Sequence, residues 1–100
     1  MIFFHLILFM KTRVECKITG RVQGVAYRDF AQKQAWLLGV VGIAENRPDG
    51  SVFVVAEGEE DDLKKFVKIL EQGPHASHVE KLETLYSAAT GEYPGFEIVG

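Results

Sequence analysis

The segment TRVECKITGRVQGVAYRDFAQKQAWLLG, residues 12–39, decides the fold, because it predicts a strand, a loop and a helix in immediate succession. Apolar and charged residues alternate over residues 12–19, which is the pattern of a strand with one buried face. Apolar residues then recur at helical spacing from Tyr27 to Leu38 and stop at Gly39, which predicts a helix with a glycine C-cap. The loop between them therefore leads directly into a helix N-terminus.

This loop combines two glycines, Gly20 and Gly24, with Arg28 in the first turn of the predicted helix. Glycine allows backbone angles that point successive N–H groups at one position, and a helix N-terminus adds unpaired N–H groups and a positive dipole. An arginine adds a planar set of donors. These features predict a site for phosphate or carboxylate. On spacing alone, an ordinary tight connection with a solvated arginine fits equally well.

The rest of the chain alternates between further predicted strands and a second helix. Arg-Pro-Asp-Gly at residues 47–50 is a turn sequence that joins two strands into a hairpin. The order βαββαβ with an additional short strand predicts an α+β ferredoxin-like split βαβ sandwich, with two helices on one face of a mainly antiparallel sheet. The predicted further strands are residues 40–46, 51–57, 79–86 and 96–99, and Gly58 ends the second of these strands. The second helix starts at residues 59–62 and stops at Gly73. Its apolar face consists of Leu63, Phe66, Val67 and Leu70.

Composition describes a single small domain and excludes several kinds of site. One hundred residues with 47% hydrophobic content are enough for one core. The net charge of −3 and the lack of a basic stripe argue against nucleic-acid binding. Three scattered histidines and the single Cys16, on the predicted core face of a strand, form no metal-ligand pattern, so we expect no metal and no cofactor. A single cysteine fits a reducing, cytoplasmic location.

The first ten residues are apolar except for His5. They are too few for a membrane-spanning helix, which needs about 20 apolar residues, and they lack the basic start and the cleavage site of a signal peptide. Either residues 1–9 are an extension before a natural start at Met10, which we favour, or they pair as an additional strand. We therefore divide the chain into an apolar extension, residues 1–9, and a domain, residues 10–100. Left exposed, such a segment favours self-association.

Two motifs resemble the signatures of the acylphosphatase family. The first is ITGRVQGVAYR at residues 18–28, and the second is GIAENRPDGSV at residues 42–52, followed by Gly58. Gly73-Pro74 with Val79 beyond it is similar to a third landmark of that family. The resemblance implies the same ferredoxin-like fold. It also implies a small-molecule substrate, an acyl phosphate, which is hydrolysed to a carboxylate and inorganic phosphate without a metal or a phosphoenzyme.

The same resemblance implies that Arg28 and Asn46 are the catalytic residues. An acyl phosphate already has a good leaving group, so the protein needs only to hold the phosphoryl group, spread its developing charge and orient one water in line. Arg28 and the loop N–H groups would bind the phosphoryl oxygens, and the Asn46 side chain would orient the water through its carbonyl oxygen while its amide donates to the phosphoryl group. The phosphate-binding residues expected from the motif are Arg21, Val22, Gln23, Gly24, Val25, Ala26, Tyr27 and Arg28.

The chain departs from the family pattern at three positions. Tyr27 stands in place of a phenylalanine and keeps the ring. Ile43 stands in place of an aromatic residue, which changes the packing of a strand or one wall of the site. Glu45 adds a negative charge beside Asn46, but alternation along a strand predicts that these two side chains lie on opposite faces. The expected effect of Glu45 is therefore small.

Two alternatives to a free-standing hydrolase stay open at this point. A binding module with the same loop could hold phosphate or an acyl phosphate without turnover, and Ile43 and Glu45 are the residues that would favour it. The acylphosphatase-like domain that opens carbamoyl-transferring hydrogenase maturation factors shares the resemblance. Those proteins continue into cysteine-rich zinc modules, whereas this chain has one cysteine. Turnover of an acyl phosphate distinguishes a hydrolase from a binding module.

Overall fold

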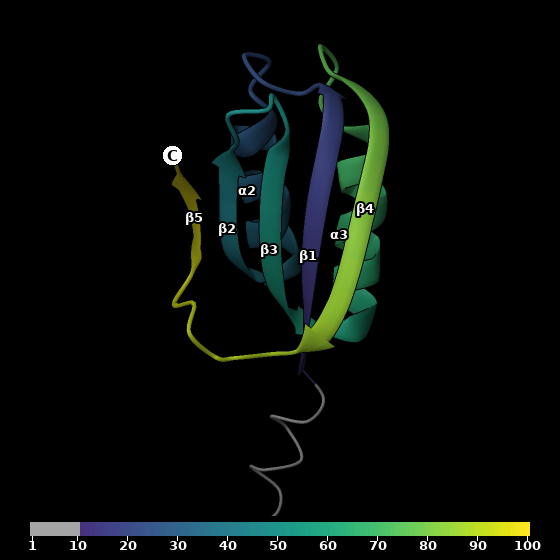
Figure 1. Cartoon of the computed structure of the whole chain (residues 1–100). Coiled ribbons are helices and arrows are strands. Elements are labelled where there is room, and N and C mark those ends of the chain that lie inside the picture. Colours follow the sequence, from purple (N-terminus) through teal and green to yellow (C-terminus); the bar gives the residue numbers. More distant parts are fainter. Residues whose placement is uncertain (1–10) are drawn as a thin grey trace, which may run out of the picture.

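The computed structural model describes residues 11–100, in which two helices pack against one face of a five-stranded sheet (Figure 1). The sheet order is β4-β1-β3-β2-β5, and every pairing is antiparallel except that of β2 with β5. The predicted α+β ferredoxin-like order is therefore confirmed. The elements are β1 (Lys11–Arg21), α2 (Tyr27–Leu38), β2 (Val41–Asn46), β3 (Val52–Glu59), α3 (Glu60–Gln72), β4 (His78–Ala88) and β5 (Phe96–Val99).

Helix α2 has the predicted limits, whereas two strands run further than predicted. Gly39 caps α2 in the left-handed conformation and donates its N–H to the last turn. Strand β4 extends to Ala88 because it pairs with almost the whole length of β1. The prediction that Gly58 ends β3 is wrong, because Gly58 and Glu59 pair with the first residues of β1. Local turn signals were outweighed in both cases by pairing with a distant strand.

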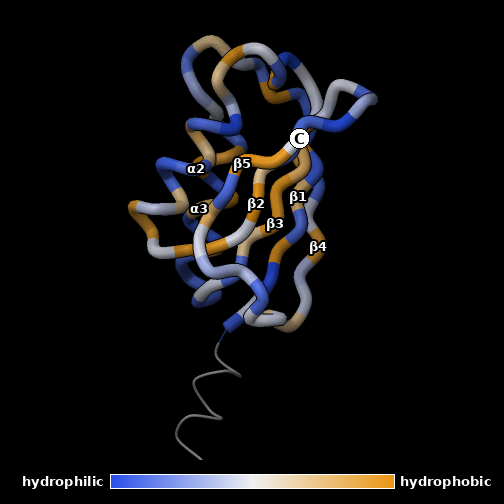
Figure 2. The backbone as a smooth tube through the Cα atoms, turned by 90° about the vertical axis from the view of Figure 1, so that its left-hand side faces the viewer, coloured by the Kyte–Doolittle hydropathy of each residue, from blue (hydrophilic) through white to orange (hydrophobic). Residues whose placement is uncertain are grey.

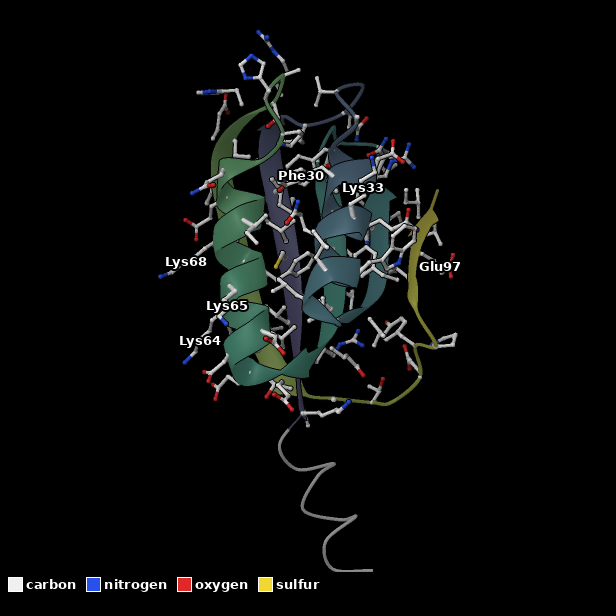
Figure 3. The ribbon with its side chains drawn as sticks, turned by 180° about the vertical axis from the view of Figure 1, so that it is seen from behind. Phe30, Lys33, Lys64, Lys65, Lys68 and Glu97 are labelled. Atoms are coloured by element: carbon white, nitrogen blue, oxygen red, sulfur yellow. The ribbon has the colours of Figure 1, made fainter. Side chains whose placement is uncertain are left out.

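The core lies between the helices and the covered face of the sheet. Cys16 is fully buried on that face, and its burial raises the pKa of the thiol to about 12, so it packs as an apolar residue. The tube in Figure 2 alternates between hydrophilic and hydrophobic colours along the sheet, as expected when one face is buried. The apolar face predicted for α3 is buried, while Lys64, Lys65 and Lys68 point outward from that helix (Figure 3). The largest buried side chains are Tyr27, Phe66, Phe96, Ile18, Leu63 and Leu70.

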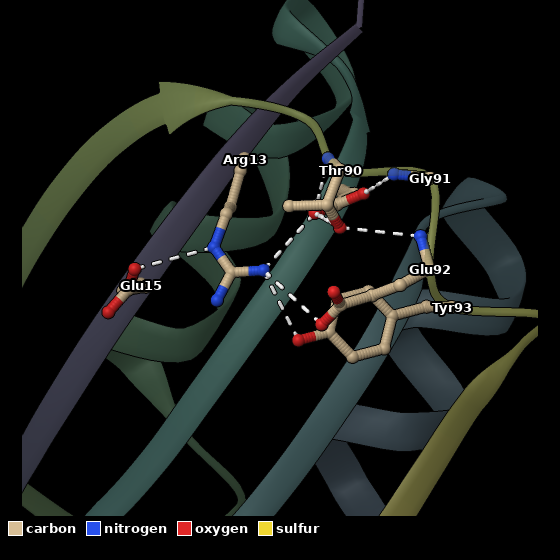
Figure 4. A network of polar contacts seen from close by, with 7 residues as sticks. Arg13, Glu15, Thr90, Gly91, Glu92 and Tyr93 are labelled. Carbon is tan, nitrogen blue, oxygen red and sulfur yellow. Dashed lines mark hydrogen bonds and ion pairs between the residues drawn. The ribbon is translucent and has the colours of Figure 1, made fainter.

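A crossover, residues 89–95, carries the chain from β4 across one end of the sheet to β5 at the opposite edge (Figure 1). Glu57 of β3, which is 3% exposed, fixes this crossover. It accepts hydrogen bonds from the N–H and Oγ1 of Thr90 at 2.9 and 2.8 Å, from the N–H of Gly91 at 2.9 Å and from Nη1 of Arg13 at 3.2 Å (Figure 4). The same Nη1 donates to the hydroxyl of Tyr93 at 3.2 Å. These hydrogen bonds fix the path of the crossover, which leads to β5 at its position beside β2.

No helix within residues 11–100 is long and apolar enough to cross a membrane. The predictions for residues 1–9, an apolar extension or an additional strand that favours self-association, lie outside the described residues. The boundary between that extension and the domain is therefore still a prediction.

Gly20 lies within β1 and not in the loop, contrary to its predicted part in the anion site. Its φ is 128°, and a Cβ there would lie 2.1 Å from the carbonyl oxygen of His78, at the point where the pairing of β1 with β4 shifts by one residue. Glycine is needed here for the close approach of two strands. The loop needs a positive φ at Gly24 instead, where a Cβ would meet nothing within 4 Å.

We expect Gly20→Ala to lower the free energy of unfolding by about 2 kcal/mol or more, because the methyl group would separate β1 from β4. Urea unfolding measures this. Gly91→Ala is the matched control, since Gly91 also has a positive φ, of 75°, but no atom within 4 Å of the added Cβ. Equal losses in the two variants would show that the contact with His78 does not matter.

Candidate active site

The loop from β1 to α2 combines two residues in the left-handed conformation with backbone N–H groups that have no partner within residues 11–100. Gly24 and Ala26 have φ values of 73° and 60°, and Ala26 is the only non-glycine residue in the described chain with a positive φ. No side chain caps the start of α2. Within residues 11–100, none of the N–H groups of residues 23–29 donates a hydrogen bond to another residue. A left-handed alanine and a row of available donors at a helix N-terminus are the features of an anion-binding nest.

Side chains of the loop hold this backbone in place. Val22 is 1% exposed and lies in the core. Nε2 of Gln23 donates to the carbonyl oxygens of Arg47 and Ser51, at 2.8 and 2.9 Å, and so joins the loop to the turn between β2 and β3. The buried Tyr27 hydroxyl donates to the carbonyl oxygen of Leu70 at 2.5 Å, a contact with α3 that phenylalanine could not make. Burial raises the pKa of Tyr27, so this hydroxyl stays a donor.

Arg28 lies in the first turn of α2 and reaches the end of β5. Its Nη1 donates to the carbonyl oxygen of Gly100 at 3.2 Å and to that of Val99 at 3.5 Å. Within the described chain, Nε and Nη2 of Arg28 have no hydrogen-bond partner. The guanidinium is therefore held at one nitrogen and keeps other donors for a ligand. Nothing in the sequence pattern pointed to β5 as the support of this side chain.

Asn46 ends β2, and its side chain lies at the same site. Among residues 11–100, its Oδ1 is the one buried side-chain polar atom without a hydrogen-bond partner. A buried acceptor left unpaired costs about 1–3 kcal/mol and calls for an explanation, of which a functional role is one. A cavity of about 270 Å³ brings Asn46 together with the loop; it is lined by Val22, Gly24, Ala26, Tyr27, Arg28, Asp29 and Asn46.

The structure thus brings the two predicted catalytic residues and most of the predicted loop to one cavity, with three exceptions. Arg21 belongs to β1, where it pairs with His78, Gln23 is directed to the neighbouring turn, and Val25 packs against the core. Asp29 also lines the cavity, although the motif did not predict it as a site residue. The available signal was its position next to Arg28, in the first turn of the predicted helix.

Ile43 and Glu45, the two residues of β2 that depart from the family pattern, do not line the cavity. Oε1 of Glu45 pairs with Nε of Arg47 at 2.5 Å, and the guanidinium of Arg47 lies over the ring of Phe53, 4.3 Å from its centroid. Glu45 and Asn46 pair with successive residues of β3, so their side chains lie on opposite faces, as predicted. Ile43 also lines no part of the cavity. The charge of Glu45 is therefore neutralised outside the site.

Asp49 belongs to the turn between β2 and β3. Its Oδ1 accepts hydrogen bonds from the hydroxyl and the N–H of Ser51, at 2.6 and 3.0 Å, and its Oδ2 pairs with Nζ of Lys17 at 3.2 Å. The hydrogen bonds from Ser51, supported by Lys17, hold the pKa of the Asp49 carboxyl well below its usual range. These contacts make Asp49 a residue that closes the turn. Within residues 11–100, no three His, Cys, Asp or Glu side chains gather as a metal site.

Comparison with known proteins identifies one family. The family model described as Acylphosphatase matches residues 14–98. A curated acylphosphatase of Thermus thermophilus is 48% identical over 86 residues, which are 86% of this chain and 97% of that protein. The crystal structure of acylphosphatase from Bacillus subtilis superposes with a TM-score of 0.86 at 34% identity, over 89% of this chain and 99% of that one. Full-length HypF, in a phosphate- and nucleotide-bound form, has a TM-score of 0.82 at 28% identity, over 90% of this chain but 12% of that one.

Proposed function

The chain belongs to the acylphosphatase family and is an acyl-phosphate hydrolase, and from this premise we propose that Arg28 and Asn46 carry the reaction in the cavity between β2 and α2. The substrate is a small-molecule acyl phosphate, and the products are a carboxylate and inorganic phosphate. The observation that carries the assignment is that Asn46, whose buried Oδ1 has no partner, lines the same cavity as Arg28 and the loop.

In this proposal, Arg28 and the loop bind the phosphoryl group. The N–H groups of residues 23–29 and the guanidinium are fixed before substrate arrives, the former by the left-handed Gly24 and Ala26 and the latter by the carbonyl oxygen of Gly100. Donors that are already oriented stabilise the charge that develops on the equatorial oxygens without a cost of reorganisation. Preorganisation of this kind supports a role in turnover as well as in binding.

Asn46 would orient the attacking water. Its Oδ1 accepts a hydrogen bond from the water, and its NH₂ group donates one to the phosphoryl group, so that the water oxygen lies in line with the bond to be broken. The oxygen attacks phosphorus, the bond from phosphorus to the acyl oxygen breaks, and the carboxylate leaves with that electron pair. A neutral amide is not a strong base, so the proton of the water passes to a phosphoryl oxygen or to solvent.

Asn46→Ala is expected to lower kcat for benzoyl phosphate by about 100-fold, the scale of removing one preorganised group from a reaction centre. Release of phosphate under saturating substrate measures it. Inorganic phosphate should still inhibit the variant, at a moderately higher concentration, because Arg28 and the loop are unchanged while one hydrogen bond from the Asn46 amide is lost.

Gln34→Ala serves as the control, since it removes an amide from α2 outside the cavity. If Asn46→Ala keeps most of the activity of the wild type, Asn46 does not orient the water. Phosphate binding without turnover of any acyl phosphate by the wild type would instead indicate the non-catalytic binding module.

We also propose a cytoplasmic location and action without nucleic acid. The free thiol of Cys16 is buried in the core, which suits a reducing compartment. The net charge of −3 is unfavourable for a polyanionic partner. Self-association through residues 1–9 stays a prediction of the same kind, which comparison of the full chain with a chain starting at Met10 by size-exclusion chromatography would test.

A further inference from the structure

Asp29 carries the one carboxylate among the residues that line the cavity. It lies in the first turn of α2, is exposed, and forms no ion pair with a basic side chain of residues 11–100. Lys33, one turn further along the same helix, lies on its outer surface (Figure 3). Asp29 therefore places an uncompensated negative charge at a site whose other features attract anions.

We propose that Asp29 determines specificity, selecting against acyl phosphates whose acyl group is negatively charged and in favour of neutral or cationic acyl groups. The inference rests on the proposed function, because it takes the cavity to be the substrate site. Arg28 and the loop N–H groups satisfy the phosphoryl charge, which every substrate shares. A charge on the acyl group, by contrast, varies between substrates, and Arg28, which binds the phosphoryl group, is the one basic residue among those lining the cavity.

The neighbouring charges support this assignment to Asp29. Glu45, the carboxylate next to Asn46 in sequence, is paired with Arg47 on the other face of the sheet and does not line the cavity. Asp29 also opposes the positive end of the α2 dipole. Two unit charges about 4 Å apart in water interact by about 1 kcal/mol, which is about fivefold in a rate or binding constant. Discrimination of about threefold to fivefold for each acyl charge is therefore expected.

The test compares three rigid substrates: benzoyl phosphate, 4-carboxybenzoyl phosphate and 4-(trimethylammonio)benzoyl phosphate. Each substrate is compared with itself across enzyme variants, so its intrinsic reactivity cancels. Asp29→Asn, which keeps the size of the side chain, should raise kcat/KM for the anionic substrate relative to benzoyl phosphate by about threefold to fivefold. It should lower the relative kcat/KM for the cationic substrate by a similar factor. Both changes should shrink in 1 M salt, where charges are screened over about 3 Å.

Asp62→Asn is the matched control, since it removes an acid from the first turn of the other helix, α3, away from the cavity. It should leave the relative kcat/KM of both charged substrates unchanged. Ratios that stay the same in Asp29→Asn, with normal hydrolysis of benzoyl phosphate, would overturn the inference and leave the proposed function intact. If Arg28→Ala and Asn46→Ala instead hydrolyse benzoyl phosphate normally, the proposed function is overturned, because the reaction then takes place elsewhere.

Discussion

Replacing Arg28 by alanine is expected to lower kcat/KM for benzoyl phosphate by at least about 100-fold and to weaken inhibition by inorganic phosphate. The guanidinium is the only cationic group among the residues that line the cavity, so its loss leaves the phosphoryl group with neutral donors, the loop N–H groups and the Asn46 amide. Removal of one preorganised donor typically costs 10²-fold to 10³-fold, and Arg28 provides a full charge as well. Initial rates of phosphate release, together with the inhibition constant for phosphate, measure both effects.

Arg28→Lys separates charge from geometry. Lysine restores a positive charge but not the planar arrangement of donors, so we expect it to recover phosphate inhibition better than it recovers kcat. Lys33→Ala is a suitable control, because it removes an exposed cation from the same helix outside the cavity. A near-normal rate for Arg28→Ala, with Lys33→Ala also normal, would show that the guanidinium takes no part in turnover.

Features encoded by neighbouring residues were predictable. The alternation over residues 12–19 and the helical spacing up to Gly39 placed β1 and α2, and Gly24 marked the loop that lines the cavity. The motif around Asn46 placed that residue at the end of β2. Each of these depends on local backbone preference and on which face of an element is apolar, and both can be read from spacing.

Contacts between distant residues were not predictable in the same way. The support of Arg28 by the backbone oxygens of Val99 and Gly100, at the end of β5, depends on the path of the crossover, and backbone carbonyl groups have no sequence signature. Gly20 looked like a loop residue, but its close approach to His78 depends on the register between β1 and β4. Glu57 is the last residue of the strand predicted over residues 51–57, and it is buried because Arg13 and the crossover cover it. Spacing along a chain contains no information on such partners.

Glu57→Ala is expected to lower the free energy of unfolding by about 3 kcal/mol, which would be the largest loss of stability among the variants considered. The change leaves Arg13, whose side chain is 18% exposed, without its buried partner, and it leaves the N–H groups of Thr90 and Gly91 unpaired. Urea unfolding at pH 7 measures the loss. Glu83→Ala is the control: its ion pair with Lys81 is 3.7 Å long and exposed, so a change below about 0.5 kcal/mol is expected.

The fold stabilises the ionised form of Glu57. The contribution of Glu57 to the free energy of unfolding therefore depends on pH. Burial alone would raise the pKa of Glu57, but the hydrogen bonds from Thr90, Gly91 and Arg13 outweigh it and hold the pKa below its usual range. A lowered folded-state pKa means that the stabilisation is complete above the unfolded value of about 4.3 and is lost as the pH falls through the folded value. Glu57→Gln has no such proton to gain, so the difference in unfolding free energy between it and the wild type should be largest at pH 7 and should shrink below pH 4. A difference that stays constant from pH 7 to pH 3 would mean that the network holds Glu57 by shape and not by charge.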